Sequence, residues 1–146
     1  MNDLYNTDFA LWSTQQAEAL RRRAANEIDW NNVAEEIEAL AKSDRRDLAS
    51  RIQTILDHLI RLQASPATQP RRGWERTLIV QREGIRRLLK DSPSLRHEVA
   101  GIIAEELPTV RRLALLALEE HSEVPTIDVE RLSFTEVDVL GSPSAD

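Results

Sequence analysis

An apolar repeat runs through residues 30–63 without a break. Its positions recur at steps of three or four residues, and no glycine or proline occurs between Trp30 and Gln63. The positions are Trp30, Ala34, Ile37, Ala41, Asp44, Leu48, Ile52, Ile55, Leu59 and Leu62. This spacing is typical of one face of an α-helix. The sequence therefore predicts a single helix of roughly 34 residues, about 50 Å long at 1.5 Å per residue, with Asp29 as its N-cap. The carboxylate of Asp44 on this face indicates that the face opens to water there, or that Arg45, Arg51 or a partner subunit pairs with it.

Helical spacing also marks the segments on either side of this long helix. A first helix is predicted from Asp8 or Thr14 to about Ala25, where Ser13 and Gln16 have the spacing of a capping box. After a proline-containing connection, a third helix is predicted over residues 74–91. The whole chain has four glycines, which leaves long stretches with helical spacing, so the pattern favours helix throughout.

The last predicted helix follows a cap at Ser92. Its apolar stripe consists of Leu95, Val99, Ile102, Val110, Leu113 and Leu116. Pro108 falls inside that stripe, where a proline removes a backbone hydrogen bond and kinks or divides a helix. Beyond Glu123 we expect a tail with one turn capped by Ser133 and Glu136.

These elements predict an all-α fold, an up-and-down bundle of four to five helices with one long central helix and a short C-terminal capped turn. Residues 1–146 are expected to form a single helical domain, with the C-terminal tail beginning at about residue 124. The chain has no cysteine, which excludes disulfides and thiolate metal sites. No apolar run approaches the roughly 18 residues of a membrane span, and Asp3 and Asp8 stand where a signal peptide has basic residues. We therefore expect a cytoplasmic protein that does not enter a membrane.

Carboxylates are concentrated near the start of the long helix. On a helical wheel Glu35 and Glu38 share one side, which is predicted to face water. Glu36 lies on another side, in line with Asp47 and His58, so a metal site built on Glu36, Asp47 and His58 is one hypothesis. The alternative is local pairing, in which Asp47 binds a nearby arginine and His58 bonds within its own helix.

Basic residues are concentrated in one segment of an acidic chain. The formal net charge is -6, yet residues 71–90 contain seven basic and two acidic side chains. Arg72, Arg76, Arg82 and Arg86 are candidates for binding an acidic protein or nucleic acid. Exposed aromatic residues, on which single-stranded bases stack, are not interleaved with these arginines, so nucleic acid is the less favoured partner. The alternative is that the arginines pair with acidic helices of the same chain.

Several segments together resemble a bacterial family catalogued as domain of unknown function 29. They are "TDFALWSTQQAEALR", "IDWNNVAEEIEALAKSDRRDLASRI", "HLIRLQ" and "RGWERTLIVQREGIRRLLKDSPSL". The resemblance covers about residues 5–140, and the chain departs from it at Ala41, where the family usually has glycine, and at Leu62 and Pro108. It implies a small all-α protein and no particular activity.

The sequence contains no phosphate-binding glycine loop, nucleophile elbow or zinc-binding His-Glu-x-x-His motif. We therefore expect a non-enzymatic interaction protein without a cofactor, which binds a protein partner or a second copy of itself. A metal-assisted hydrolase or metal-binding protein using Glu36, Asp47 and His58 is the alternative from a different class. Nucleic-acid binding through the basic third helix is a second alternative.

Overall fold

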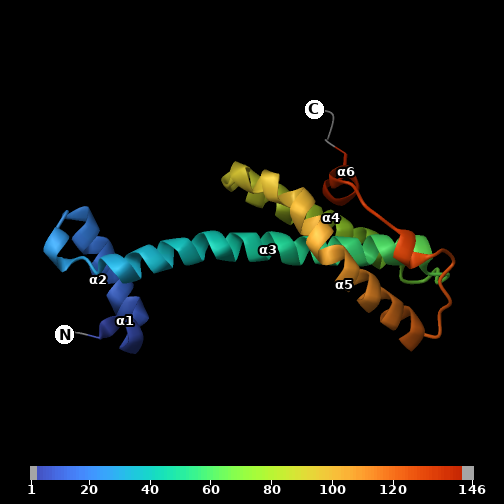
Figure 1. Ribbon diagram of the computed structural model, residues 1–146, viewed down its shortest axis with the longest axis horizontal. Coiled ribbons are helices and arrows are strands. Elements are labelled where there is room, and N and C mark those ends of the chain that lie inside the picture. Colours follow the sequence, from blue (N-terminus) through green and yellow to red (C-terminus); the bar gives the residue numbers. More distant parts are fainter. Residues whose placement is uncertain (1–2, 143–146) are drawn as a thin grey trace. The chain divides into compact units, whose positions relative to one another are not determined.

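The computed structural model describes residues 3–142, and within that range every regular element is a helix (Figure 1). The longer elements are α2 (Phe9–Arg21), α3 (Trp30–Ala64), α4 (Arg71–Asp91) and α5 (Val99–Glu120). The short elements are α1 (Leu4–Thr7), α6 (Glu136–Leu140) and the 3-10 helices η1 (Ala25–Glu27), η2 (Pro93–Glu98) and η3 (Val129–Arg131). The all-α prediction is confirmed. None of these helices is long and apolar enough to cross a membrane.

The long helix α3 is continuous over 35 residues and passes through Asp44 without a break. Asp44 itself is exposed, as expected for a carboxylate that would cost free energy to bury on the apolar face. The chain forms two compact units that divide within this helix, between Ser43 and Asp44. We call them the N-terminal unit and the C-terminal unit and describe each by itself.

The N-terminal unit consists of α1, α2, η1 and the first turns of α3. Helix α2 begins after Asp8, whose carboxylate accepts a hydrogen bond from the Leu11 backbone N–H at 3.1 Å. The predicted capping box at Ser13 does not form, because Ser13 lies inside the helix and donates to the Ala10 carbonyl oxygen. Among the described residues of this unit only Trp12 and Ala19 are buried, so its core is small.

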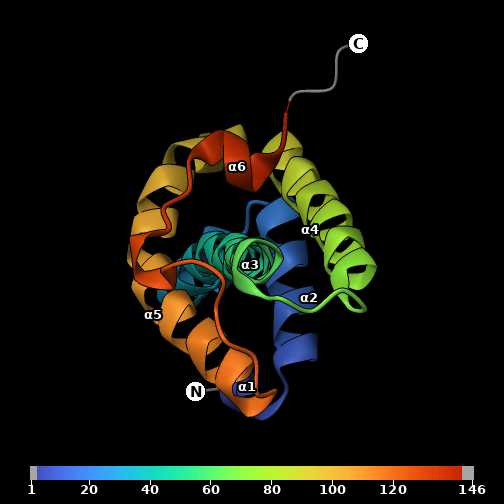
Figure 2. The same ribbon diagram turned by 90° about the vertical axis from the view of Figure 1, so that its right-hand side faces the viewer.

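The C-terminal unit contains the main core of the protein. Figure 2 looks along α3 and shows α4 and α5 on opposite sides of its C-terminal half, with α6 between α4 and α5. From α3 the core takes Leu48, Ile52, Ile55, Leu56, Ile60 and Ala64. From α4 and α5 it takes Leu78, Ile85, Val99, Ile102, Ile103, Leu107, Val110, Ala114 and Leu118. The predicted stripe is confirmed at Leu48, Ile52 and Ile55. Beyond these the fully buried positions are Leu56, Ile60 and Ala64, and the predicted Leu59 and Leu62 are half-buried beside them.

In helix α5 the predicted apolar stripe is wrong after Val110. Leu113 and Leu116 are exposed by 58% and 55% of their surface, whereas Ala114 and Leu118 are buried. After Val110 the buried positions advance by four residues twice, so the core-facing line drifts away from the predicted one. Pro108 lies within the continuous helix and is exposed, so it does not divide α5.

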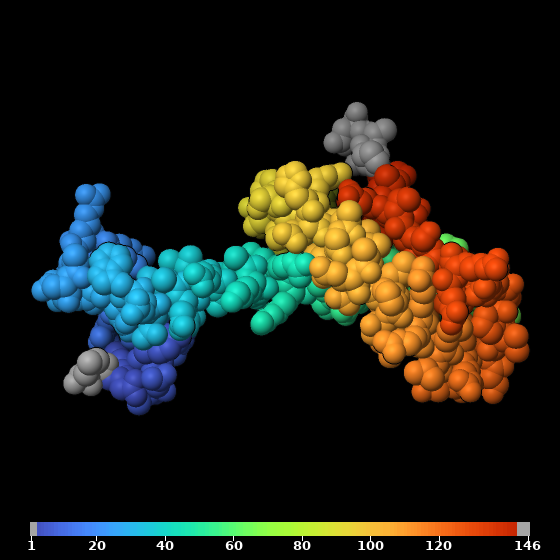
Figure 3. All heavy atoms as spheres, in the orientation of Figure 1, coloured from blue at the N-terminus to red at the C-terminus, as the bar shows by residue number. Residues whose placement is uncertain are grey.

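The segment after α5 is bound to the core rather than left as a tail. The Thr126 backbone N–H donates to the Ala64 carbonyl oxygen at 2.8 Å, and Val129 and Val139 are buried. The predicted C-terminal turn exists as α6, but Thr135 and Asp138 form its capping box in place of Ser133 and Glu136. The cap lies two residues further along because this register buries Val139, while Val137 stays exposed. Figure 3 shows α6 against the last turns of α4 and the residues that follow them.

Candidate functional site

The three candidate metal ligands each have a hydrogen-bond partner within the chain. Glu36 accepts a hydrogen bond from the Tyr5 hydroxyl at 2.5 Å. Asp47 accepts one from Arg51 Nε at 3.1 Å. His58 Nδ1 lies 2.8 Å from the Thr54 carbonyl oxygen, which can only accept, so this nitrogen carries the proton. The contacts of Asp47 and His58 match the alternative of local pairing along the helix, whereas Glu36 is bound by a residue of α1.

The structure does not bring the candidate ligands together. Asp47 and His58 are eleven residues apart on α3, which corresponds to about 16 Å along a helix axis. Glu36 belongs to the N-terminal unit. Within residues 3–142 no group of three or more histidine, aspartate or glutamate side chains is placed to hold a metal ion.

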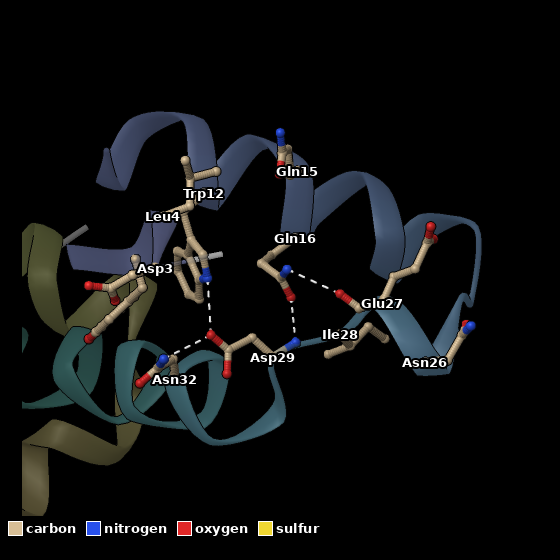
Figure 4. A pocket seen from close by; sticks show the side chains of 11 residues that line it. Asp3, Leu4, Trp12, Gln15, Gln16, Asn26, Glu27, Ile28, Asp29 and Asn32 are labelled. Atoms are coloured by element: carbon tan, nitrogen blue, oxygen red, sulfur yellow. Dashed lines mark hydrogen bonds between the residues drawn. The ribbon is translucent and has the colours of Figure 1, made fainter. Parts of the chain in front are cut away.

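A hydrogen-bond network around Asp29 fixes the start of α3. Asp29 Oδ2 accepts bonds from the Trp12 indole N–H at 3.2 Å and the Asn32 amide at 2.8 Å. The Gln16 side chain accepts from the Asp29 backbone N–H at 2.7 Å and donates to the Glu27 carbonyl oxygen at 3.2 Å. Figure 4 shows these bonds along one wall of a hollow of about 800 Å³ in the N-terminal unit. The sequence offered Asp29 only as a helix cap, and the four-residue spacing of Trp12 and Gln16 on α2 was the signal for this network.

The lining of this hollow carries negative charge but no acid–base pair. Its ionisable side chains are Asp3, Tyr5, Glu27 and Asp29. No histidine or basic residue of the described chain lines it. Since Asp29 is occupied by Trp12 and Asn32, the network holds α2 against the first turn of α3. This is a structural role.

Tyr5 is the single tyrosine of the chain and reports on this unit. Its hydrogen bond to Glu36, together with partial burial, raises the pKa of the Tyr5 phenol from 10.0 to about 12. Because the folded pKa is raised, this bond stabilises the unit fully below pH 10, and its contribution is lost as the pH rises to about 12. We expect a phenolate absorbance titration to give a midpoint near 12, falling towards 10 in Glu36→Ala and unchanged in the control Glu18→Ala. A wild-type midpoint near 10 in the folded protein would contradict the Tyr5–Glu36 contact.

The apolar face at the start of α3 is uncovered. Trp30, Ile37 and Leu40 are exposed by 59%, 62% and 68% of their surface. Every residue from Ile37 to Asp44 is exposed. The half-buried residues of these turns are Asn32, Val33 and Glu36, so α1 and α2 cover the flank of the helix. We call the exposed face the α3 stripe; its residues are Trp30, Ala34, Ile37, Leu40 and Ala41.

The four candidate arginines of α4 have different environments. Arg82 donates to the Val139 and Asp138 carbonyl oxygens at 3.1 and 2.7 Å, and so holds the end of α6. Arg86 pairs with Glu83 on the same helix, with Nε at 2.9 Å from the carboxylate. Arg72 and Arg76 are exposed and have no hydrogen-bond or ion-pair partner among the described residues. The alternative of pairing with acidic helices is therefore not met at Arg72 and Arg76, and Arg82 binds backbone carbonyl oxygens in place of carboxylates.

A groove with apolar walls lies beside these arginines. It has a volume of about 690 Å³ and is bounded by α4, α6 and η2. Its apolar lining includes Ile79, Leu89 and Val137. Arg96, also in the lining, is exposed and forms no ion pair with any residue in the described range. The charged lining residues are Arg82, Arg86 and Arg96 with Glu83 and Glu136, three basic and two acidic side chains, so the groove combines apolar contact area with a net charge of +1.

A comparison with protein families gave one match. The family model described as "Domain of unknown function DUF29" matches residues 4–138. No curated protein and no solved structure matches the chain. The matched range includes α1 to α5 and most of α6. The Asp29 network, the α3 stripe and most of the groove bounded by α4, α6 and η2 therefore lie within it.

Proposed function

The chain belongs to the family described as Domain of unknown function DUF29, and we propose that it acts without catalysis, by binding another protein through the α3 stripe. The observation that supports this proposal is the exposure of Trp30, Ile37 and Leu40 on one face of a regular helix. Soluble proteins seldom leave a contiguous apolar face open to water unless another molecule covers it. Binding of a partner would remove this face from water, and the hydrophobic effect would stabilise the complex.

The helical geometry of the stripe fits a known mode of recognition. Trp30, Ala34, Ile37 and Ala41 follow one another at steps of four, three and four residues. An amphipathic helix that binds in a groove of a partner presents its anchors at this spacing. The Asp29 network supports the same function, because it holds the first turn of α3 in place before binding and so lowers the entropy lost on association.

The test is a double substitution that leaves the fold intact. We expect Ile37→Ser/Leu40→Ser to keep the helical circular dichroism of the wild type, because both side chains are exposed. The matched control is Leu113→Ser/Leu116→Ser, which removes two similarly exposed apolar side chains from α5. Native mass spectrometry of each purified protein, and of each protein after capture from its own lysate, measures self-association and bound partners.

The wild type and the α5 control are expected to form the same complex, and the stripe variant to lose it at least tenfold. That loss corresponds to about 1.4 kcal/mol of binding free energy, which is within reach of two buried aliphatic side chains. If the stripe variant forms every complex of the wild type, the proposal is wrong.

A further inference from the structure

We infer that the partner of the α3 stripe is a second copy of this chain, which receives the stripe in its groove between α4 and α6. This inference rests on the proposed function and names the partner of the same surface. It starts from two surfaces that the chain leaves open. One is apolar with carboxylates beside it, and the other is apolar with guanidinium groups beside it.

Charge complementarity connects the two surfaces. The N-terminal unit, residues 1–43, contains four basic and eight acidic side chains, a net charge of -4. Helix α4 contains seven basic and three acidic side chains, a net charge of +4. Copies of one chain therefore attract each other when these regions face one another, and like charges oppose the pairing of either region with itself.

On α3 the Glu38 carboxylate stands at the edge of the apolar anchors, and that of Glu35 lies further round the helix. With Trp30 at 0° and 100° per residue, Ile37 lies at about 340°, Glu38 at about 80° and Glu35 at about 140°. Both carboxylates are exposed and have no ion-pair partner within residues 3–142. A partner that covers the stripe therefore meets the negative charge of Glu38 at one edge, with that of Glu35 behind it, and a cation at this edge would be paired on binding.

The groove offers the opposite arrangement. Arg72, Ile79, Arg86 and Lys90 follow one another on α4 at steps of seven, seven and four residues, which places them on one line of the helix. Ile79 is exposed by 68% of its surface although it lines the groove. Arg72 lies on this line seven residues before Ile79, outside the groove lining, and Arg96 lines the groove beyond the end of the line. Both are without an ion-pair partner in the described chain. A partner helix that is apolar and acidic can form ion pairs with these arginines, which a neutral helix cannot.

Two such contacts between the same pair of copies close a dimer. Each copy then gives its stripe to the groove of the other, and no surface of either kind is left open. A single contact would leave one stripe and one groove free to bind further copies, so the closed pair is the form we propose.

The experiment is a charge exchange between two variants of the full chain, followed by native mass spectrometry. The first variant is Glu35→Lys/Glu38→Lys, and the second is Arg72→Glu/Arg96→Glu. We expect the wild type at twice the chain mass of 16.6 kDa, and each variant alone at the single mass. When the two variants are mixed, one contact pairs the two altered surfaces and the other pairs two wild-type surfaces, so the dimer returns as a mixed species. Glu119→Lys/Glu120→Lys, a double change of the same size on exposed positions of α5, is expected to stay dimeric.

The outcomes separate this inference from the proposed function. A monomeric wild type, or a mixture that stays monomeric, overturns the inference. If the monomer nevertheless captures another protein through Ile37 and Leu40, the proposed function stands with a different partner. If the wild type is monomeric and the second variant loses binding to a DNA or RNA duplex that the wild type binds, the groove belongs to nucleic acid and the inference is again wrong. If the dimer persists in Ile37→Ser/Leu40→Ser, the stripe does not form the dimer contact, and both the inference and the proposed function of the stripe are wrong.

Discussion

Trp12→Ala is expected to unfold the N-terminal unit while the C-terminal unit keeps its structure. Trp12 is one of two buried side chains described in that unit, its ring centroid lies 4.7 Å from that of Tyr5, and its indole bonds to Asp29. Replacing a buried tryptophan with alanine typically costs 3–5 kcal/mol. A unit of 43 residues has little stability beyond that. Hydrogen exchange on the full chain should show α1 and α2 losing protection, with unchanged protection of the buried turns of α5.

Two companion variants identify the cause. Trp12→Phe keeps an aromatic ring but removes the indole N–H, so it should cost only about 1–3 kcal/mol, the penalty for losing one bond to a charged acceptor. Phe9→Ala removes a ring that is half exposed and should leave α2 protected. Unchanged protection of α2 in Trp12→Ala would show that the stability of this unit does not depend on the packing of Trp12.

Leu56→Ala should lower the free energy of unfolding of the C-terminal unit by about 2–5 kcal/mol. Leu56 is fully buried on α3, among side chains of the core that α4 and α5 complete. The substitution removes the apolar transfer energy of the side chain and leaves a cavity that the surrounding helices fill only in part. Urea denaturation followed by circular dichroism measures the change.

Leu116→Ala is the matched control, because it is the same substitution on a helix of the same unit. Leu116 is exposed, so the change should stay within about 0.5 kcal/mol. The sequence pattern predicted Leu116 as part of the core stripe. Equal costs for Leu56→Ala and Leu116→Ala would favour the predicted stripe over the one in the structure.

The course of α3 was predictable because it depends on local properties. Helical spacing without glycine or proline extends from Trp30 to Gln63, and the observed helix runs from Trp30 to Ala64. The spacing also identifies the apolar face correctly as far as Ile55, after which the buried line moves to Leu56 and Ile60. It does not tell which part of that face is covered, since the same pattern continues from the exposed Ile37 to the buried Ile52.

The site depended on contacts that no local pattern contains. Asp29 was placed correctly before the long helix, but its bonds to Trp12 and Asn32 depend on how α2 turns back through η1. Glu36 was singled out among the carboxylates as a candidate metal ligand, whereas its partner in the structure is Tyr5, 31 residues earlier in the chain. Such pairs form between elements whose packing is not encoded in the spacing of either one.

The C-terminal segment is held largely through its backbone. Arg82 donates to the carbonyl oxygens of Asp138 and Val139, Arg111 donates to that of Leu132, and the Thr126 backbone donates to that of Ala64. A carbonyl oxygen is the same whichever side chain its residue carries. Thr126 is an exception, because its exposed hydroxyl also donates to the Gln63 and Ala64 carbonyl oxygens at 3.2 Å. The bonds to backbone oxygens do not depend on the segment's other exposed side chains, so most of these positions can diverge over evolutionary time while the chain keeps the same path.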